Sequence, residues 1–390
     1  MIQIKDKSAC CGCAACVQRC PKQCISLKED KEGFLYPIVD ESTCIDCRLC
    51  EKVCPIINQS EPRQPLKVYA AKHKDDEIRL KSSSGGIFTL LAEQIIDEGG
   101  VVFGARFDEY WEVLHDYSET KEGLAVFRGS KYVQSRIGST YQQAEAFLKE
   151  GRKVMYTGTP CQIAGLKRFL RKEYENLLAV DFICHGVPSP KVWRMYLDKT
   201  LACQGIGKNT VLSHAMLRKK FIRCIDFRSK STGWKKYSFS LTLTKALGDG
   251  KDNSVLLSST FEENPFMKAF VNNLNLRMSC YHCLFKYGRS RADVTLGDYW
   301  GIDKNIQDFT DDIGVSLFML NDDIFINVEK IELRESRFND AIIWNPSYKY
   351  SVKYSKLRKL YMSLILENID ILSNWLIFRL LRKLYSIVEK

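Results

Sequence analysis

Cys10-Cys11-Gly12-Cys13-Ala14-Ala15-Cys16-Val17-Gln18-Arg19-Cys20-Pro21 and Cys44-Ile45-Asp46-Cys47-Arg48-Leu49-Cys50-Glu51-Lys52-Val53-Cys54-Pro55 are two copies of one cysteine pattern. Each copy reads C-x2-C-x2-C-x3-C-P, the ligand run of bacterial ferredoxins that hold 4Fe–4S cubanes. Three cysteines of such a run can bind one cubane, and the fourth, followed by proline, normally reaches the other cubane. The sequence therefore predicts a small α+β ferredoxin-like domain with two 4Fe–4S clusters.

The expected ligand sets cross between the two runs. The first cluster takes Cys10, Cys13, Cys16 and Cys54, and the second takes Cys44, Cys47, Cys50 and Cys20. Paired CxxC motifs also bind zinc, but zinc needs four ligands and each run offers three near ones and one distant one. A structural disulfide framework is the least favoured alternative, because of the compartment that the composition indicates.

The composition favours a cytoplasmic iron–sulfur protein of two or three domains. The chain has 390 residues, which exceeds the length of a ferredoxin and allows a full hydrophobic core. Residues 1–7 lack the apolar segment of a signal peptide, and no apolar run is long enough to span a membrane. Sixteen cysteines in such a chain are typical of a reducing compartment in which thiolates bind metal.

The formal charge of +11 does not indicate a nucleic-acid partner. An oxidised cubane with its four thiolates carries about −2, so three clusters would lower the charge to about +5. Residues 1–58 contain as many acidic as basic side chains and become acidic once clusters bind. The positive charge therefore lies on the rest of the chain, which suits an acidic electron-carrying module facing a basic body.

The order of motifs predicts four segments. Residues 1–58 form the ferredoxin-type domain, a polar, proline-rich linker covers 59–66, a body covers 67–345, and a basic helical tail covers 346–390. At the start of the body, Ser82-Ser83-Ser84-Gly85-Gly86 leads into a helix expected over residues 87–98. A Ser/Gly loop before a helix can present backbone N–H groups to an anion, and plain serine capping is the equal alternative.

The centre of the body reads as a β-α-β unit. Strands are expected over 153–157 and 177–183, with a helix over 162–174 between them. Such strands are parallel with a right-handed crossover. Cys161 and Cys184 then follow the carboxyl ends of neighbouring strands, which is the edge where open α/β sheets bind ligands.

Two further cysteines complete a possible third ligand set. Cys280 and Cys283 follow a helix expected from Asn264-Pro265 to about residue 276. With Cys161 and Cys184 they make four thiols, which we expect to hold a third 4Fe–4S cluster. Buried structural cysteines and a zinc site are the alternatives. The four remaining cysteines have no matching spacing and are interpreted as packing or surface thiols: Cys11, Cys24, Cys203 and Cys224.

The tail is interpreted as helical and basic. Its apolar positions include Trp375, Leu376, Phe378, Leu380 and Leu381. Packing on the body is the default expectation for such a face. Peripheral membrane contact through a basic amphipathic face is the less favoured alternative.

Several stretches together resemble the beta subunits of coenzyme F420 hydrogenases and dehydrogenases, and the 7-hydroxymethyl chlorophyll a reductases are similar. The resemblance covers about residues 5–320 in order. The stretches that carry it are residues 82–86, 128–135, 158–162, 181–190, 280–283 and 292–301. The resemblance implies an α/β flavin-binding body with a mainly parallel sheet, one FAD, one 4Fe–4S cluster beside it and two more in the N-terminal domain.

The resemblance also implies the residues that contact the flavin. These are Ser82, Ser83, Ser84, Gly85, Gly86, Gly129, Ser130, Lys131, Tyr132 and Gln134. Lys131 would be the charge partner of a phosphate or of the N1–C2 edge of the flavin ring. The chain lacks the glycine fingerprint of nicotinamide-binding folds.

The sequence thus predicts an iron–sulfur flavoprotein oxidoreductase. Electrons would pass between ferredoxin-type clusters, the inner cluster and FAD, and an organic substrate or deazaflavin would exchange hydride at the flavin. His185 and Tyr299 are candidate proton donors, and a buried structural histidine is the alternative for His185. Expected partners are a redox protein such as ferredoxin, or another protein that carries the catalytic site.

Three other functions are alternatives. The chain could be an electron-transfer subunit with no substrate of its own, docked to a catalytic partner. It could be a reductase in surface polysaccharide synthesis. A regulatory iron–sulfur sensor is the least favoured, because it would leave the flavin motifs unused.

Overall fold

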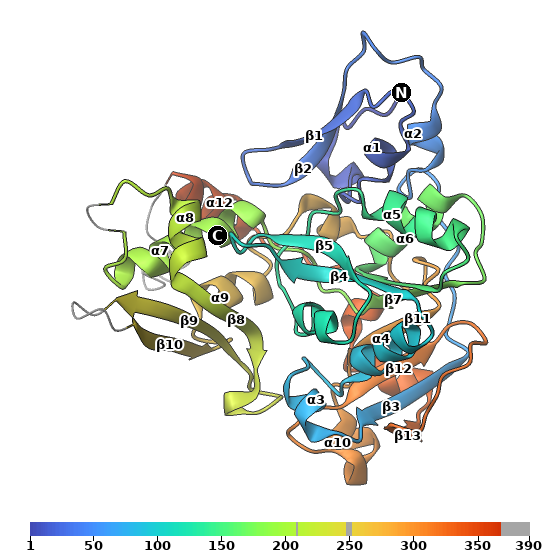
Figure 1. Cartoon of the computed structure of the whole chain (residues 1–390), viewed down its shortest axis with the longest axis vertical. Helices are drawn as coiled ribbons and strands as arrows, with labels where there is room; N and C mark the ends of the chain where they lie inside the picture. The colour runs from blue at the N-terminus through green and yellow to red at the C-terminus, as the bar shows by residue number, and fades with distance from the viewer. Residues whose placement is uncertain (208–209, 247–251, 368–390) are drawn as a thin grey trace, which may run out of the picture.

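The computed structural model describes residues 1–207, 210–246 and 252–367. Three sheets organise these residues: a two-stranded sheet near the N-terminus, a central sheet of eight strands, and a separate sheet of three strands. In Figure 1 the N-terminal part lies at the top, next to helices α5 Thr140–Lys149 and α6 Pro160–Leu170, and the three-stranded sheet lies at the left. This arrangement is an α/β body with a small α+β N-terminal part.

The N-terminal part is built from two similar halves. Its elements are α1 Ala15–Arg19, β1 Ile25–Glu29, β2 Leu35–Val39 and α2 Leu49–Lys52. Strands β1 and β2 pair as an antiparallel hairpin. Helices α1 and α2 each begin after a left-handed residue, Ala14 with φ 60° and Arg48 with φ 57°. These two residues occupy the same position in the two cysteine runs, so both runs fold into the same local turn.

The central sheet has the strand order β13-β3-β12-β11-β7-β6-β4-β5. Its strands are β3 Lys67–His73, β4 Val101–Phe107, β5 Val113–Ser118, β6 Val154–Gly158, β7 Leu177–Phe182, β11 Val294–Asp298, β12 Ser316–Leu320 and β13 Ile331–Glu335. Strands β4, β6, β7 and β11 pair in parallel and β3 runs in their direction, whereas β5, β12 and β13 run in the opposite direction. The mainly parallel sheet that the resemblance implied is thus a parallel centre with antiparallel edges.

Helices cover both faces of this sheet because neighbouring strand residues alternate between faces. Val101 and Phe103 of β4 pack in the cluster that includes residues of α5 Thr140–Lys149 and α6 Pro160–Leu170. Val102, between them, packs instead with residues of α4 Ile87–Asp97. Helix α6 begins directly after β6, with Thr159 and Gln162 forming a capping box and Pro160 in the first turn. The expected β-α-β unit is therefore present as β6-α6-β7 with parallel strands.

The three-stranded sheet was not predicted from the sequence. It contains β8 Ile222–Ser229, β9 Ser238–Ala246 and β10 Asp252–Thr260, all antiparallel. The remaining helices are α3 Asp76–Leu80, α7 Pro190–Cys203, α8 His214–Phe221, α9 Pro265–Val271, α10 Ile302–Asn305, α11 Phe338–Ile342 and α12 Leu357–Leu366. Trp193 of α7, Phe239 of β9 and Phe266 of α9 form an aromatic core between this sheet and its helices.

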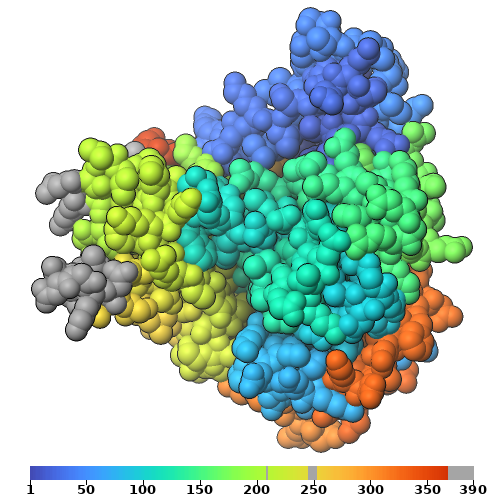
Figure 2. All heavy atoms as spheres, viewed as in Figure 1, coloured from blue at the N-terminus to red at the C-terminus, as the bar shows by residue number. Residues whose placement is uncertain are grey.

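The N-terminal part is fixed to the body by buried and charged contacts. Gln18 accepts hydrogen bonds from the backbone N–H groups of Tyr141 and Gln142 at the start of α5. Glu32, at the tip of the β1–β2 hairpin, pairs with Arg358 of α12. Figure 2 shows these N-terminal residues, in blue, as a cap on the green surface of the body.

The segment expected as a linker is also bound to the body. Arg63 pairs with Asp322 at 2.9 Å, and the backbone N–H of Leu66 donates to the carbonyl of Leu320. Residues 59–66 therefore hold the two parts together as an ordered connection rather than as a free tether.

Part of the expected tail packs on the body. Tyr361, Met362 and Ile365 of α12 lie in the same core as the three-stranded sheet. The apolar positions predicted further on lie outside the described residues: Trp375, Leu376, Phe378, Leu380 and Leu381. Among the described helices, none has the length and apolar character needed to cross a membrane.

Candidate iron–sulfur and flavin sites

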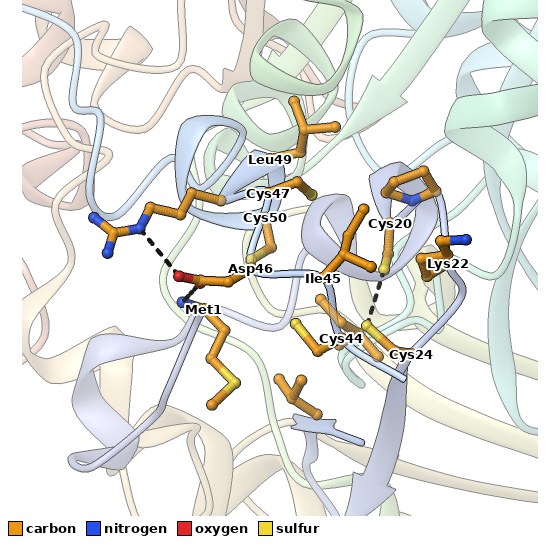
Figure 3. Close-up of a pocket in the computed structure, with 14 residues that line it drawn as sticks. Met1, Cys20, Lys22, Cys24, Cys44, Ile45, Asp46, Cys47, Leu49 and Cys50 are labelled. Atoms are coloured by element: carbon orange, nitrogen blue, oxygen red, sulfur yellow. Dashed lines mark hydrogen bonds and ion pairs between the residues drawn. The ribbon is translucent and has the colours of Figure 1, made fainter. Parts of the chain in front are cut away.

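The second predicted ligand set lines one pocket of the N-terminal part, which we call the outer pocket (Figure 3). Its thiols are Cys20, Cys44, Cys47 and Cys50, with Cys24 as a fifth. The Sγ atoms of Cys20 and Cys24 are 3.3 Å apart. Cys47 is exposed, and the N-terminal amine of Met1 pairs with Asp46 at 2.9 Å on the rim. The outer pocket therefore opens to the surface.

The first predicted ligand set also comes together. Burial, followed by the proximity of Cys10 and Cys54, raises the pKa of Cys16 to about 12. The pKa of the Cys13 thiol is likewise raised by burial and by Cys16 and Cys54, although a hydrogen bond with Cys11 opposes this. Cys54 thus lies close to Cys10 and Cys16 of the first run and also to Cys50, and Cys20 lines the outer pocket. Both positions are compatible with the crossed ligand sets, which stay a prediction.

The third predicted set lines a pocket inside the body, which we call the inner pocket. Its lining includes Cys161, Cys184, Cys280 and Cys283, and also Cys11. Cys161 is the second residue of α6 and Cys184 follows β7, so two neighbouring parallel strands deliver them to one sheet edge. Cys280 lies in the 3-10 helix η4 Met278–His282, and Cys283 is the next residue.

The surroundings of the inner pocket suit metal-bound thiolates. Burial raises the pKa of the Cys184 thiol well above its ordinary value, and burial raises the pKa of Cys280 to about 12. Such thiols are poor nucleophiles, and a coordinated cation would deprotonate them. The backbone N–H of Val187 donates to Cys280 Sγ at 3.4 Å, and Lys286 Nζ donates to the carbonyl of Cys184 at 2.6 Å.

Cys11 connects the first ligand set with the inner pocket. It is buried and packs in one core cluster with Cys13 and Cys161. A hydrogen bond with Cys13 raises the pKa of Cys11 well above its ordinary value, and a hydrogen bond with Cys11 does the same to Cys161. The sequence identified Cys11 only as a packing or surface thiol. No spacing rule could have placed it here, because the contact joins residues 150 positions apart.

The thiols surround cavities rather than a single point. In residues 1–207, 210–246 and 252–367, no three His, Cys, Asp or Glu side chains converge closely enough to hold one metal ion. A cubane has four irons at separate corners, so its thiolates must stand around a cavity. The donor sets of the outer and inner pockets have this form. Cys203 and Cys224 are exposed and line neither of these two pockets.

Two of the predicted flavin segments meet across the fold. The hydroxyl groups of Ser83 and Ser130 are 2.8 Å apart. Arg228 of β8 donates to the carbonyl of Ser83 and to the hydroxyl of Tyr132, and it pairs with Asp298 at 2.8 Å. A Cβ built on Gly129, whose φ is 78°, would meet no atom within 4 Å, so the backbone there has open space beside it.

Buried cations gather where these segments meet. Burial lowers the pKa of Lys131 to about 7, partly opposed by the charge of Asp226. Burial and the charge of Arg228 lower the pKa of Lys230 to about 8. The Nε of Arg228 is buried without a hydrogen-bond partner. These donors fit a negatively charged group such as a phosphate or a reduced flavin ring. Sequence motifs did not identify Arg228 and Lys230, because they lie on the unpredicted sheet and in the 3-10 turn after it.

Other predicted flavin contacts have structural partners. Gly86 is the N-cap of α4 with φ 87°, and no side chain caps that helix, so plain serine capping is excluded. The N–H of Gly85 donates to Ser316 Oγ, and a Cβ on Gly85 would lie 2.3 Å from the carbonyl oxygen of Ala71. The hydroxyls of Ser82 and Ser84 donate to the carbonyls of Ile78 and Val315.

Gln134 lies at the junction with the N-terminal part. Its Nε2 donates to the carbonyl of Cys11, and its Oε1 accepts from Arg277. Both ends of its amide are thus occupied on the iron–sulfur side of the body. The motif that contained Gln134 could not show that its side chain points away from Lys131 and Tyr132.

The two candidate proton donors differ in their surroundings. His185 lines the inner pocket, its Nε2 is 2.7 Å from Asn273 Oδ1, and burial lowers its pKa. Tyr299 is fully buried, and its hydroxyl contacts Ser336 and Asn305. Because that hydroxyl is enclosed by protein, we assign Tyr299 no role in proton transfer.

Aromatic rings join the flavin segments to the inner pocket. Tyr132 stacks on Phe270 with ring centroids 4.6 Å apart. Phe270 meets His185 edge-on at 5.1 Å, and His185 lines the inner pocket. A continuous set of contacts therefore runs from the predicted flavin contacts to the third thiol set.

Comparisons with known families match this arrangement. Two family models describe the N-terminal and C-terminal parts of the coenzyme F420 hydrogenase/dehydrogenase beta subunit, and they match residues 68–141 and 151–324 respectively. The chain belongs to the coenzyme F420 hydrogenase/dehydrogenase beta subunit family. Residues 9–56 match the model of a 4Fe-4S dicluster domain, so this family member carries an iron–sulfur domain at its N-terminus.

One similar solved structure is a chain of the F420-reducing NiFe hydrogenase complex from Methanosarcina barkeri. It is 19% identical, covers 80% of this chain and 90% of that chain, and has a TM-score of 0.42. No curated protein matches the sequence significantly.

Proposed function

We propose that this family member is an iron–sulfur flavoprotein oxidoreductase with three 4Fe–4S clusters and one FAD. Electrons would pass between a protein partner at the outer pocket, the first ligand set, the inner pocket and the flavin. The position of the inner pocket carries this proposal, because its Cys161 hydrogen-bonds with Cys11 and His185 lines the same pocket.

The contacts along the chain supply each step of this route. The proximity of Cys50 contributes to the raised pKa of Cys16, so the outer and first ligand sets adjoin. Cys11 lies between Cys13 and Cys161, and the rings of His185, Phe270 and Tyr132 continue from the inner pocket. Electron transfer is faster when the distance between the edges of two redox centres is shorter. Because each site in this order adjoins the next, this order is the most direct route.

The residues around Lys131 would hold the flavin. A bound flavin takes two electrons as hydride and passes them singly to clusters. Lys131, Arg228 and Lys230 would neutralise the negative charge of the flavin. The open space beside Gly129 would let the flavin lie close to the backbone there. Charge-assisted hydrogen bonds from these side chains would be stronger than neutral ones in this buried site. An organic substrate or deazaflavin coenzyme would exchange hydride with the flavin.

A second candidate is an electron-transfer subunit without a substrate of its own. The family description favours it, since the matching models are of a beta subunit. An assay of the purified holoprotein distinguishes the two functions. Turnover of an organic acceptor or of a deazaflavin without any other protein supports the oxidoreductase. Electron exchange without such turnover supports the electron-transfer subunit.

The decisive test compares two serine variants. Cys161→Ser should remove about four of twelve iron atoms and leave the N-terminal clusters in place, because the ligand sets are separate. Reduced ferredoxin should then bleach the flavin far more slowly than in the wild type, as followed by anaerobic stopped-flow absorbance. Cys203→Ser is the matched control, since Cys203 is exposed and outside both pockets.

The proposal fails if Cys161→Ser keeps its full iron content and its rate of flavin reduction. It also fails if anaerobically purified wild-type protein contains no FAD after reconstitution.

A further inference from the structure

Arg277 is a fully buried cation between the N-terminal part and the body. It precedes η4, and its side chain is 0% exposed. Its Nε donates to the carbonyl of Cys10 at 2.8 Å, and its Nη2 donates to the carbonyl of Leu35 at 2.9 Å. The guanidinium also lies over the ring of Tyr36, with its carbon 4.2 Å from the ring centroid.

Its surroundings are built to hold it in one position. Gln134 Oε1 accepts from Nη1 at 2.9 Å. Because residue 12 is a glycine, with φ 75°, the first cysteine run can lie close to Arg277. A Cβ at this position would lie 2.8 Å from Gln134 Nε2 and 2.9 Å from Arg277 Nη1. A side chain at position 12 would therefore displace the guanidinium.

No carboxylate pairs with Arg277 in the part of the chain that the structure describes. The comparable buried cations do have one: Arg358 pairs with Glu32, and Arg228 pairs with Asp298. An uncompensated buried charge is costly, and an arginine cannot escape the cost by losing its proton. The position of Arg277 therefore implies a negative partner that is not a side-chain carboxylate.

Thiols surround the guanidinium on two sides. Nη2 lies 3.6 Å from Cys10 Sγ, a predicted ligand of the first cluster. Arg277 also lines the inner pocket, together with Cys161 and Cys280. A cubane with four thiolates carries about −2 when oxidised and about −3 when reduced by one electron. Two such groups would supply the missing negative charge.

We propose that Arg277 is a positioning residue that raises the reduction potentials of the first and inner clusters, and that its effect on the first cluster is the larger. The inference rests on the proposed function, since it needs clusters in both ligand sets. A fixed positive charge stabilises the reduced, more negative state more than the oxidised one. The first cluster is affected more because the guanidinium reaches the sulfur of its own ligand, Cys10.

The test is a redox titration of Arg277→Gln, with each cluster followed by EPR. We expect the first cluster to become at least about tenfold harder to reduce, equivalent to a shift of ~59 mV for one electron. The inner cluster should shift in the same direction by less, and the outer cluster should keep its potential.

Arg358→Gln is the matched control. Arg358 is also a buried arginine that joins the N-terminal part to the body, through Glu32 and the carbonyl of Leu276. Its charge is already balanced, and its pKa is raised by Glu32 and Tyr281 rather than by thiols. This variant should leave all three potentials unchanged.

A second variant covers the case in which Arg277→Gln does not fold. Gln134→Glu places a carboxylate of the same shape beside the guanidinium and should lower the same two potentials. Unchanged potentials in either variant with full iron content would overturn the inference, as would an equal shift in Arg358→Gln. Absence of the first or inner cluster from the wild-type protein would instead refute the proposed function.

Discussion

The outer and inner pockets hold the same number of thiols but are assembled differently. The five thiols of the outer pocket come from residues 20–50, and one of them, Cys47, is exposed. Those of the inner pocket come from the first cysteine run, from the start of α6, from the loop after β7, and from η4 and the residue after it. The outer pocket is thus a local structure at the surface, and the inner pocket is a product of the whole fold.

Under the proposed function, this difference would give the pockets different tasks. A cluster near the surface can exchange electrons with another protein, and a cluster enclosed by the body can exchange them only with its neighbours. The charged groups around the two pockets agree with these different tasks. Arg277 and Lys286 flank the inner pocket, whereas the rim of the outer pocket carries the Met1–Asp46 pair in reach of solvent. Three predictions test the comparison.

The largest effect is expected from loss of the outer cluster. Cys47→Ser should remove about four iron atoms and leave the other eight, since Cys24 interacts with Cys20 and Cys44 but not with Cys47. Electron exchange with reduced ferredoxin should fall to background, while dithionite should still reduce the flavin through the remaining sites. Anaerobic stopped-flow absorbance measures both rates. Unimpaired exchange with ferredoxin would show that partners enter elsewhere, and Cys224→Ser provides the exposed-thiol control.

A smaller effect is expected in the resistance of the clusters to chelators. Iron should leave the outer pocket several-fold faster than the inner pocket when the oxidised protein meets a chelator, because Cys47 is exposed and the inner thiols are not. EPR of re-reduced samples taken over time distinguishes the clusters. Simultaneous loss of all clusters would mean that access to solvent does not distinguish the two pockets.

The smallest effect concerns the choice between two neighbouring ligands. Cys24 Sγ lies 3.3 Å from Cys20 Sγ in the outer pocket. Cys20→Ser should therefore keep most of its iron by using Cys24, and the double variant with Cys24→Ser should lose about four atoms. The fifth thiol of the inner pocket, Cys11, lies beside Cys161 rather than Cys283, so Cys283→Ser should lose its cluster outright. Equal losses in Cys20→Ser and in the double variant would show that Cys24 cannot replace Cys20.

The sequence could predict the thiol sets because their signals are local. The two runs indicate both crossed sets by spacing alone, and this assignment stays a prediction. Cys161 and Cys184 could be brought together because parallel strands of a β-α-β unit end at one edge, and the structure has that unit. The family resemblance was confirmed by the matching family models.

Contacts between distant segments could not be predicted in this way. Arg277 has no motif, and its meaning depends on Cys10, 267 positions away. Gln134 belongs to a stretch that was interpreted as flavin-binding, yet its side chain turns toward Cys11. The sheet formed by β8, β9 and β10 was missed although it supplies Arg228. In each case the sequence shows the residue but not the direction in which its side chain points.

The crossing of the fourth cysteines constrains how the protein can be matured. Cys54 lies with the thiols of the first run, and Cys20 lies with those of the second. Neither half of the N-terminal part can then complete its own ligand set during synthesis until the other half has been made. With the proposed ligand sets, iron delivery would have to follow translation of at least residues 1–55. The inner pocket would be complete later still, because Cys283 is the last of its thiols along the chain. Under the proposed function, the thiols of the inner pocket would have to stay reduced until residue 283 has been made.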